Sequence, residues 1–366
     1  MRIETVRTLY VAAGGGGDAL GALLIRRFLD PGARDTALVS TCAWERLRID
    51  PVPGPRSRGD FVGLRSVGGV RAEIAPTSDT LPAGRTVLPR LAGDVDARVF
   101  LHDFSGGAVG LSDHLLRLAR AVEADSLTLV DVGGDAVARG DESRLLSPLA
   151  DSLAVAASIR TGLPVRLAVV GPGVDGELAA DDVLERLQTL GGKRVGVVTP
   201  TDVEAMKHVL AWHPTEATTL VAAAALGYRG AVDMRRGLEP VPLVDESAAV
   251  WIVNDPSPEA LPLAAALMRT RSLTSAEQIM RDVAVNELDY ERRRSVERLS
   301  SPPIQTPSVI IDESRDRGAT LITTRRLLEA THADLPNFEN ARVDGLGLWD
   351  LSELAESGRS GRRPVS

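Results

Sequence analysis

Short apolar runs rich in β-branched residues alternate along the chain with helical patterns. The runs that we predict to be strands are 6–13, 36–40, 98–101, 126–131, 165–170, 194–199 and 250–253. The segment 18–29 shows the helical pattern most clearly, because Leu20, Leu23, Leu24 and Phe28 fall on one face of a helix. Strands and helices that alternate in this way build a parallel sheet with helices on both faces. We therefore predict an α/β fold with a doubly wound, mostly parallel, Rossmann-like sheet.

The pattern changes after residue 270. Before it, further helices are predicted at 112–123, 148–159, 180–190, 202–212, 215–226 and 258–268. After it, we predict helices at 275–285, 287–299 and 325–330, short strands at 309–312 and 319–323, and a proline-rich break at 300–307. The segment 357–366 is rich in glycine and arginine, a composition typical of a disordered tail. The predicted organisation is a Rossmann-like domain at 1–270, a helical or α+β C-terminal extension at 271–356, and a tail.

The composition narrows the class of protein. With 366 residues, of which 44% are hydrophobic, the chain can bury a sizeable core. Its formal net charge of −8 argues against a nucleic-acid partner, which needs clustered cations. Cys42 is the only cysteine, and no apolar run has the length of a membrane helix or a secretory signal. We therefore expect a cytoplasmic protein with neither a membrane nor a nucleic acid as partner.

A run of four glycines lies between the first predicted strand and the first predicted helix. Glycines at this position let the backbone approach a ligand, and the helix N-terminus offers free N–H groups. The residues expected to bind a cofactor or substrate here are Gly14, Gly15, Gly16, Gly17 and Asp18. Gly14, Gly16 and Gly21 approach the dinucleotide fingerprint, but the last gap is too long. Asp18 suits a ribose hydroxyl, an amine or a metal better than a bare phosphate, or it caps the helix.

Acidic residues crowd the stretch that follows the predicted strand 126–131. Its sequence DVGGDAVARGDE covers 131–142, and SPLAD follows at 147–151. We take Asp135, Asp141 and Glu142 as candidate catalytic residues and Arg139 as a binding residue that balances their charge. Such carboxylates could bind Mg²⁺ or Mn²⁺, hold ribose hydroxyls or act as general acid and base, and the alternative is a solvated acidic loop. No cysteine or histidine spacing indicates zinc.

Other candidates stand at the ends of further predicted strands. Asp175 follows the strand 165–170 in a glycine-rich turn and could bind a ligand, although a plain loop explains it equally well. His102 ends the strand 98–101 and is a candidate catalytic base, whereas the lone His213 is interpreted as structural. The chain has no Gly-x-Ser-x-Gly motif, so serine hydrolase chemistry is unsupported.

Several motifs together carry a family resemblance. They are WERLRIDPVPGPR at 44–56, the acidic stretches at 131–142 and 147–151, WHPTEA at 212–217 and the opening glycine run. With them the chain resembles domain of unknown function family 1152, found in archaea and actinobacteria, over nearly all of residues 1–300. The resemblance implies one Rossmann-like unit and, for actinobacterial members, suggests a place in biosynthetic pathways. It brings no assigned reaction.

Three functions are compatible with these features. The leading hypothesis is an enzyme that acts on a polar, nucleoside- or nucleotide-like small molecule by hydrolysis, lysis or transfer at a C–N or C–O bond. It predicts that loss of Asp141 or Glu142 abolishes turnover. The second is a nicotinamide- or flavin-dependent oxidoreductase, which is weakened because Ser40–Thr41 rather than an acidic residue ends the second strand. The third is a non-catalytic ligand-binding or scaffold protein of a biosynthetic assembly. Base rates for such proteins favour a homo-oligomer.

Overall fold

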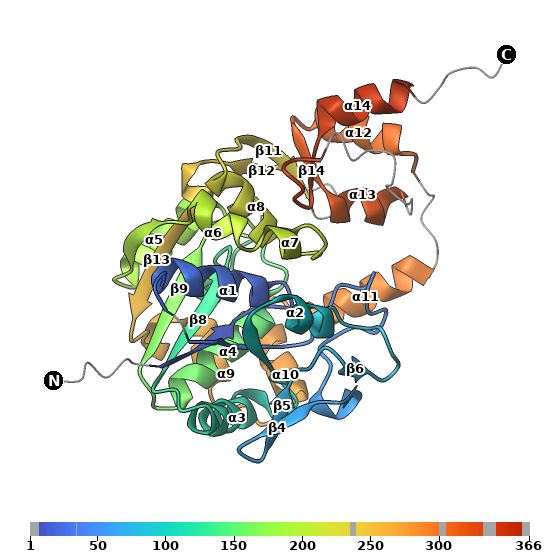
Figure 1. Cartoon of the computed structure of the whole chain (residues 1–366). Helices are drawn as coiled ribbons and strands as arrows, with labels where there is room; N and C mark the ends of the chain where they lie inside the picture. Colours follow the sequence, from blue (N-terminus) through green and yellow to red (C-terminus); the bar gives the residue numbers. More distant parts are fainter. Residues whose placement is uncertain (1–6, 34, 235–238, 300–304, 332–341, 361–366) are drawn as a thin grey trace.

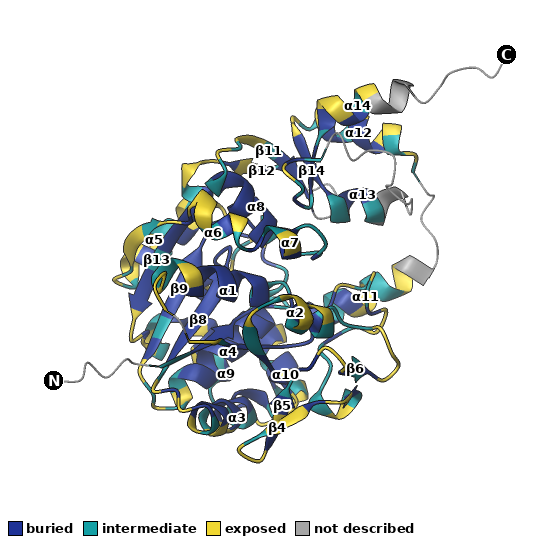
Figure 2. Cartoon of the chain, in the orientation of Figure 1, coloured by how far each residue is buried: buried dark blue, intermediate teal, exposed yellow. Residues whose placement is uncertain are grey.

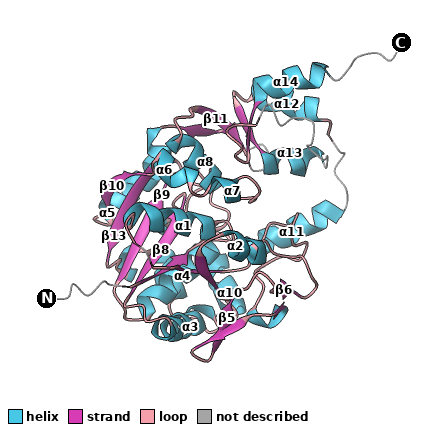
Figure 3. Cartoon of the chain, in the orientation of Figure 1, coloured by secondary structure: helices cyan, strands magenta, loops and turns pink. Residues whose placement is uncertain are grey.

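A nine-stranded sheet forms the centre of the molecule in a computed structural model that describes residues 7–33, 35–234, 239–299, 305–331 and 342–360 (Figures 1 and 3). Five of its strands are parallel to one another and stand in the spatial order β7-β2-β1-β8-β9. They are β1 (Thr8–Ala12), β2 (Ala37–Thr41), β7 (Ala97–Leu101), β8 (Ser126–Val132) and β9 (Val165–Val170). Numbered along the chain, this order is 3-2-1-4-5, so the winding direction reverses between β1 and β8. The predicted doubly wound, mostly parallel sheet is confirmed.

Antiparallel strands extend the sheet at both edges. Beyond β9 lie β13 (Ala249–Asn254) and β10 (Lys193–Val197), and beyond β7 lie β5 (Val70–Glu73) and β4 (Arg65–Val67). A separate small sheet pairs β3 (Phe61–Val62) with β6 (Asp79–Thr80). These edge strands flank the parallel strands and leave the carboxyl ends of β1 and β8 near the middle of the sheet.

Alternating side chains of the strands feed two cores, one on each face of the sheet. Leu9 and Val11 of β1 belong to one core, while Tyr10 and Ala12 belong to the other, as the two-residue period of a strand requires. The first core packs against α3 (Gly107–Ala121), α4 (Pro148–Arg160), α5 (Ala180–Thr189), α9 (Pro262–Leu267) and α10 (Leu273–Val283). The second packs against α1 (Asp18–Leu29), α2 (Leu88–Asp94), α6 (Pro200–Glu204), α7 (Lys207–Leu210) and α8 (Ala217–Ala225). The buried sheet therefore lies between two layers of helices (Figure 2).

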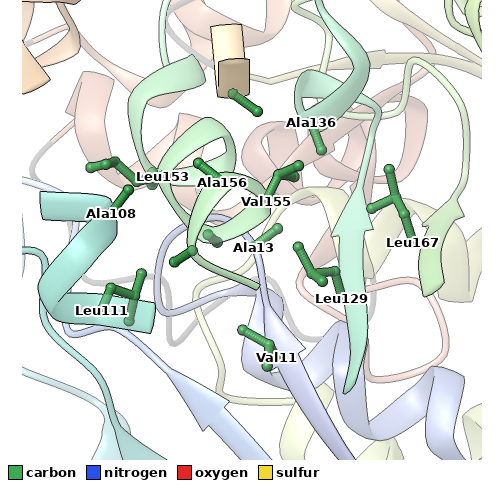
Figure 4. Close-up of a cluster of buried hydrophobic side chains, with 14 of the residues drawn as sticks. Val11, Ala13, Ala108, Leu111, Leu129, Ala136, Leu153, Val155, Ala156 and Leu167 are labelled. Atoms are coloured by element: carbon green, nitrogen blue, oxygen red, sulfur yellow. The ribbon is translucent and has the colours of Figure 1, made fainter. Parts of the chain in front are cut away.

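Aliphatic side chains make the helix-to-sheet contact tight. In Figure 4, Leu153 and Val155 of α4 lie with Val11 and Leu129 of the sheet in one cluster. Gly21 of α1 allows a similar approach on the other face, because a Cβ there would stand 2.4 Å from Cγ2 of Val132. Close packing of α1 against β8 fixes where the N-terminus of α1 points.

The C-terminal lobe has its own sheet and core. Its strands, in spatial order, are β12 (Val241–Leu243), β11 (Gly230–Asp233), β14 (Leu321–Thr323) and β15 (Leu348–Asp350). Its helices are α12 (Pro307–Asp316), α13 (Thr324–Thr331) and α14 (Leu351–Ser360). Its core includes Ile310, Ile322, Leu327, Trp349 and Leu354. Because β11 and β12 precede residue 250, the lobe is built from two segments that are distant in sequence.

The structure departs from the predicted extension in several places. Residues 309–312 belong to α12 and not to a strand, because Pro307 begins a helix whose apolar Ile310 and Ile311 face the lobe core. From the expected boundary at 270 onward, α10 and the start of α11 (Glu287–Leu299) pack on the first core through Met280 and Leu288. The predicted helix 202–212 is divided into α6 and α7. Helix α14 continues to Ser360, four residues into the segment expected to be a disordered tail, while 361–366 and most of the break 300–307 lie outside the described residues.

Across these described ranges, no helix combines the length and the apolar character needed to cross a membrane.

Candidate functional site

A polar pocket of about 90 Å³ opens at the carboxyl ends of β1 and β8. Open α/β sheets bind their ligands at this kind of topological switch point. Segments from both the main sheet and the C-terminal lobe line it: Gly14–Asp18, Trp44–Arg46, Val132, Asp135, Ser147, Ala150, Asp151, Asp175, His213–Ala217, Met234, Glu287 and Arg325. Within the described part of the chain, seven of these residues carry a carboxyl group and only two carry a guanidinium group. The pocket is therefore strongly acidic.

Asp18 turns its carboxylate back over the glycine loop. The N–H of Gly14 donates to Oδ2 of Asp18 over 2.9 Å, and Gly17, not Asp18, is the N-cap of α1. A Cβ at Gly14 would stand 2.5 Å from Oδ2 of Asp18 and 3.2 Å from Oδ1 of Asp151. The glycine therefore leaves room for two carboxylates rather than for a phosphate, and the alternative that Asp18 merely caps the helix is wrong.

Asp18, Asp131 and Asp151 come together from three elements. Each offers one carboxylate oxygen, and these atoms all lie within 4.8 Å of one another. Asp131 stands near the end of β8, where its two oxygens accept hydrogen bonds from the N–H groups of Gly134 and Ala136 over 3.3 and 3.1 Å. Asp151 stands in the first turn of α4. Backbone hydrogen bonds thus hold Asp18 and Asp131 in place.

Two further carboxyl groups in the pocket are buried with one oxygen unsatisfied. Asp135 begins a short 3₁₀ helix, Asp135–Val137, and is 6% exposed; its Oδ1 has no hydrogen-bond partner among the described residues. Glu287 is the first residue of α11 and is 5% exposed; over the same part of the chain its Oε2 also has none. We refer to Asp18, Asp131, Asp135, Asp151, Asp175 and Glu287 as the carboxyl cluster.

Burial and mutual repulsion disfavour ionisation of the cluster. Burial raises the pKa of Asp18 to about 7, against the lowering effect of its hydrogen bond from Gly14. Burial likewise raises the pKa of Asp135 well above its usual value, and the neighbouring carboxylate of Asp175 adds to this rise, also through a side-chain hydrogen bond. The pKa values of Asp131, Asp151 and Glu287 are raised for the same two reasons, burial first. The cluster therefore holds protons near neutral pH unless a cation offsets its charge.

His213 and two arginines complete the wall of the pocket. Nδ1 of His213 accepts a hydrogen bond from the N–H of Thr215 over 3.2 Å, which leaves the proton on Nε2. Burial lowers the pKa of His213 to about 3, so the ring is neutral and its Nε2–H is a donor without an acceptor in the described structure. Arg325 of the lobe pairs with Glu216 over 2.7 Å, while Arg46 is exposed.

The structure unites part of the predicted site and separates the rest. Gly14–Gly17, Asp18, Asp135 and Asp175 line the pocket together, as expected from strand ends on one sheet edge. Three other predicted residues, Arg139, Asp141 and Glu142, do not line it. Gly140 turns the chain with a φ of +104°, and Glu142 accepts hydrogen bonds from the N–H groups of Arg139 and Gly140 over 2.7 and 2.8 Å. Asp141 is 81% exposed and pairs with Arg139, so this loop satisfies its own charges and is not part of the site.

His102 also lies outside the pocket. It is fully buried at the end of β7, which β2 separates from β1, and its Nδ1 lies 2.9 Å from Oγ of Ser40. Burial lowers the pKa of His102 to about 3, which leaves the ring neutral. A catalytic role for His102 at this site is therefore not retained.

Sequence reasoning assigned no role to several residues of the site. Asp131 and Asp151 belong to the acidic stretches at 131–142 and 147–151. Their positions, one at the end of a predicted strand and the other at the start of a predicted helix, could have identified them as site residues. His213 was interpreted as structural, yet the residue lines the pocket, and its buried Nε2–H has no acceptor among the described residues. Glu287 and Arg325 lie far along the chain from the glycine loop, and no local pattern brings them to it.

Comparison with known proteins gives a family and nothing more specific. Searches of curated proteins and of solved structures found no significant match. The model of one protein family matches residues 9–295, which include the five parallel strands except for Thr8 and all residues of the carboxyl cluster. This chain therefore belongs to the family described as protein of unknown function, DUF1152.

Proposed function

We propose that this protein is an enzyme that cleaves or transfers a group at a C–N or C–O bond of a polar, nucleoside-like small molecule. The observation that carries the proposal is the carboxyl cluster at the switch point of the sheet, because five of its six members line the pocket and all but Asp18 are buried. Carboxyl oxygens that carry no proton only accept hydrogen bonds, and one such oxygen each of Asp135 and Glu287 lacks a donor among the described residues, so this pocket suits a ligand rich in hydroxyl or amine donors. Ribose hydroxyls fit that requirement, whereas a bare phosphate would be repelled.

Carboxyl groups that lie close together titrate at different pH values, so such a cluster can supply the two protonation states that this reaction needs. Hydrolysis of a C–N or C–O bond requires a base that takes a proton from water and an acid that protonates the leaving nitrogen or oxygen. Asp135 and Asp175, hydrogen-bonded to each other, are suited to hold one proton between them. In the proposed reaction, Asp135 donates this proton to the leaving group while another carboxylate of the cluster accepts the proton of the attacking water.

Turnover assays with matched variants test this function. The purified protein would be incubated with ribonucleosides and 5′-nucleotides, with and without divalent ions, and the products separated chromatographically. We expect release of a base or sugar from at least one nucleoside, and a loss of kcat of about 10²-fold or more in Asp135→Asn. The control variant Asp141→Asn, on the exposed loop outside the pocket, should keep the parent rate. No turnover by the parent protein, or equal losses in both variants, would contradict the proposal.

A dinucleotide-dependent oxidoreductase is the second candidate. The strand order 3-2-1-4-5 and the glycine loop favour it, and Glu45 stands just after β2, beside Gly16. However, Glu45 already accepts hydrogen bonds from Thr86 and Val87, and Asp18 occupies the N–H of Gly14 where a pyrophosphate would approach. These contacts favour the first candidate.

The proposal also includes where the enzyme acts, its oligomeric state and its metabolic context. A cytoplasmic location agrees with the free, buried Cys42. A small-molecule substrate, a homo-oligomeric state and a place in a biosynthetic pathway complete it. A passive scaffold is less compatible, because most of the carboxyl cluster lines a pocket rather than a flat surface.

A further inference from the structure

Three carboxylates, of which Asp18 and Asp151 line the pocket, have the spacing of ligands around one ion. One oxygen each of Asp18, Asp131 and Asp151 lies within 4.8 Å of the other two. Two oxygens on opposite sides of one Ca²⁺ lie roughly 4.6–5.2 Å apart, and those around Mg²⁺ lie somewhat closer. We infer that Asp18, Asp131 and Asp151 form a binding site for one hard divalent cation of the Ca²⁺, Mn²⁺ and Mg²⁺ class.

Unsatisfied oxygens beside these three residues point independently to a ligand. Oδ1 of Asp135 and Oε2 of Glu287 are buried and lack a hydrogen-bond partner among the described residues, although both side chains are more than nine-tenths buried. A buried polar atom without a partner costs free energy of the order of 1–3 kcal/mol. Both residues line the same pocket as Asp18 and Asp151. Water molecules or substrate hydroxyls held by a cation would supply the missing donors.

The charge of the pocket favours a cation over a neutral ligand alone. Arg325 is paired with Glu216, and Arg46 is exposed. Across the described residues, no ion pair joins Asp18, Asp131 or Asp151 to a basic side chain within 4.0 Å. Like charges this close repel one another, and a divalent ion between them converts repulsion into attraction.

The donor set selects the class of ion. All three ligand atoms are carboxylate oxygens, which Ca²⁺, Mg²⁺ and Mn²⁺ prefer, whereas zinc and copper favour histidine and cysteine. His213 lines the pocket but carries its proton on Nε2 and uses Nδ1 to accept from Thr215. Sγ of Cys42 donates to the carbonyl oxygen of Gly14. Neither side chain is therefore disposed to bind a soft metal.

The position of the ion would also serve the proposed function. A bound cation orients hydroxyl groups and lowers the pKa of a bound water molecule, which makes that water a better nucleophile. Binding of the ion does not, however, depend on the proposed reaction, because the inference rests on the carboxylate geometry and the unsatisfied oxygens alone.

Calorimetric titration of the full-length protein tests the site. After treatment with a chelator and removal of that chelator, the parent would be titrated separately with Ca²⁺, Mn²⁺ and Mg²⁺. We expect one equivalent of at least one ion to bind, and Asp151→Asn to weaken its binding at least tenfold. The control Asp141→Asn removes the same charge from the exposed loop and should bind as the parent does. Circular dichroism checks the fold, and Asp18→Asn, which keeps an acceptor for Gly14, provides a second variant.

The outcomes separate this inference from the proposed function. If none of the three ions binds the parent at millimolar concentration, or if Asp151→Asn and Asp18→Asn bind as the parent does, the cation site is overturned. Ion binding without turnover of any nucleoside would leave the site standing and overturn the function. Turnover that persists after chelator treatment, in a protein that binds no ion, would overturn the cation site and leave the proposed function standing.

Discussion

At the scale of single residues, glycines at a few positions leave the space that the acidic side chains of the site occupy. Gly14 gives its space to the carboxylates of Asp18 and Asp151, and a Cβ at Gly133 would stand 2.3 Å from Cγ of Asp175. Gly133 also has a φ of +127°, which side chains rarely adopt. Gly14 and Gly133 therefore make room for acidic side chains, a role that differs from that of the glycines in a dinucleotide fingerprint.

His102 gives a residue-scale prediction about pH. Its pKa is about 3 in the folded protein, against 6.5 for an ordinary histidine, so between these values the unfolded chain binds a proton that the folded chain does not. Its contribution to stability is therefore lost as the pH falls below 6.5, by about 2 kcal/mol at pH 5. We expect the free energy of unfolding of the parent to fall by about this much more than that of His102→Gln when the pH is lowered from 7.5 to 5. Urea unfolding of both proteins at both pH values measures this difference. An equal difference between the two proteins at both pH values would show that His102 is not the cause.

At the scale of elements, one buried carboxylate ties together the segments of the C-terminal lobe. Asp233 at the end of β11 is fully buried, and its Oδ2 accepts hydrogen bonds from Ser314 over 2.5 Å, from Arg326 over 3.4 Å and from Arg317. Loss of one partner of a buried ion pair costs about 3–5 kcal/mol. Asp233→Ala should therefore increase hydrogen exchange in α12 and α13. Asp245→Ala, which removes an ion pair with Arg229 at a carboxylate 86% exposed, should change exchange little. Equal exchange in both variants would argue against this role of Asp233.

The elements also show how far sequence reasoning reaches. The apolar strands β1, β8 and β9 and the amphipathic helix α1 were predicted within two residues at each end, because local periodicity determines them. β11 and β12 were not predicted, since both are short and the sheet they belong to is completed by β14, which comes from far along the chain and pairs with β11. The same limit applies to the site. The strand-end acids Asp135 and Asp175 were found from their local pattern, but the pairing of Glu142 with its own loop and the arrival of Glu287 depend on tertiary structure.

At the scale of the whole molecule, the pocket lies where the main sheet meets the C-terminal lobe. The ion pair of Glu216 with Arg325 and the hydrogen bond from Thr323 to Glu216 join the start of α8 to the lobe. Helix α11, which precedes the lobe helices in the chain, brings Glu287 to the pocket. Glu291 of the same helix accepts a hydrogen bond from Nε1–H of Trp44 over 3.0 Å. The site is therefore assembled from both parts of the chain, because Glu287 of α11 and Arg325 of α13 line it together with the glycine loop.

The most direct test of the account is thermal unfolding of the parent, Asp135→Asn and Asp141→Asn in the presence of ribonucleosides, with NAD as the competing ligand. A ligand that binds only the folded state at 100 times its Kd adds about 2.7 kcal/mol to stability and raises the Tm. We predict that a nucleoside raises the Tm of the parent and of Asp141→Asn in a concentration-dependent manner, and that Asp135→Asn loses this response. A response to NAD alone, or an equal response to nucleoside in all three proteins, would contradict the claim that the carboxyl cluster binds a nucleoside-like substrate.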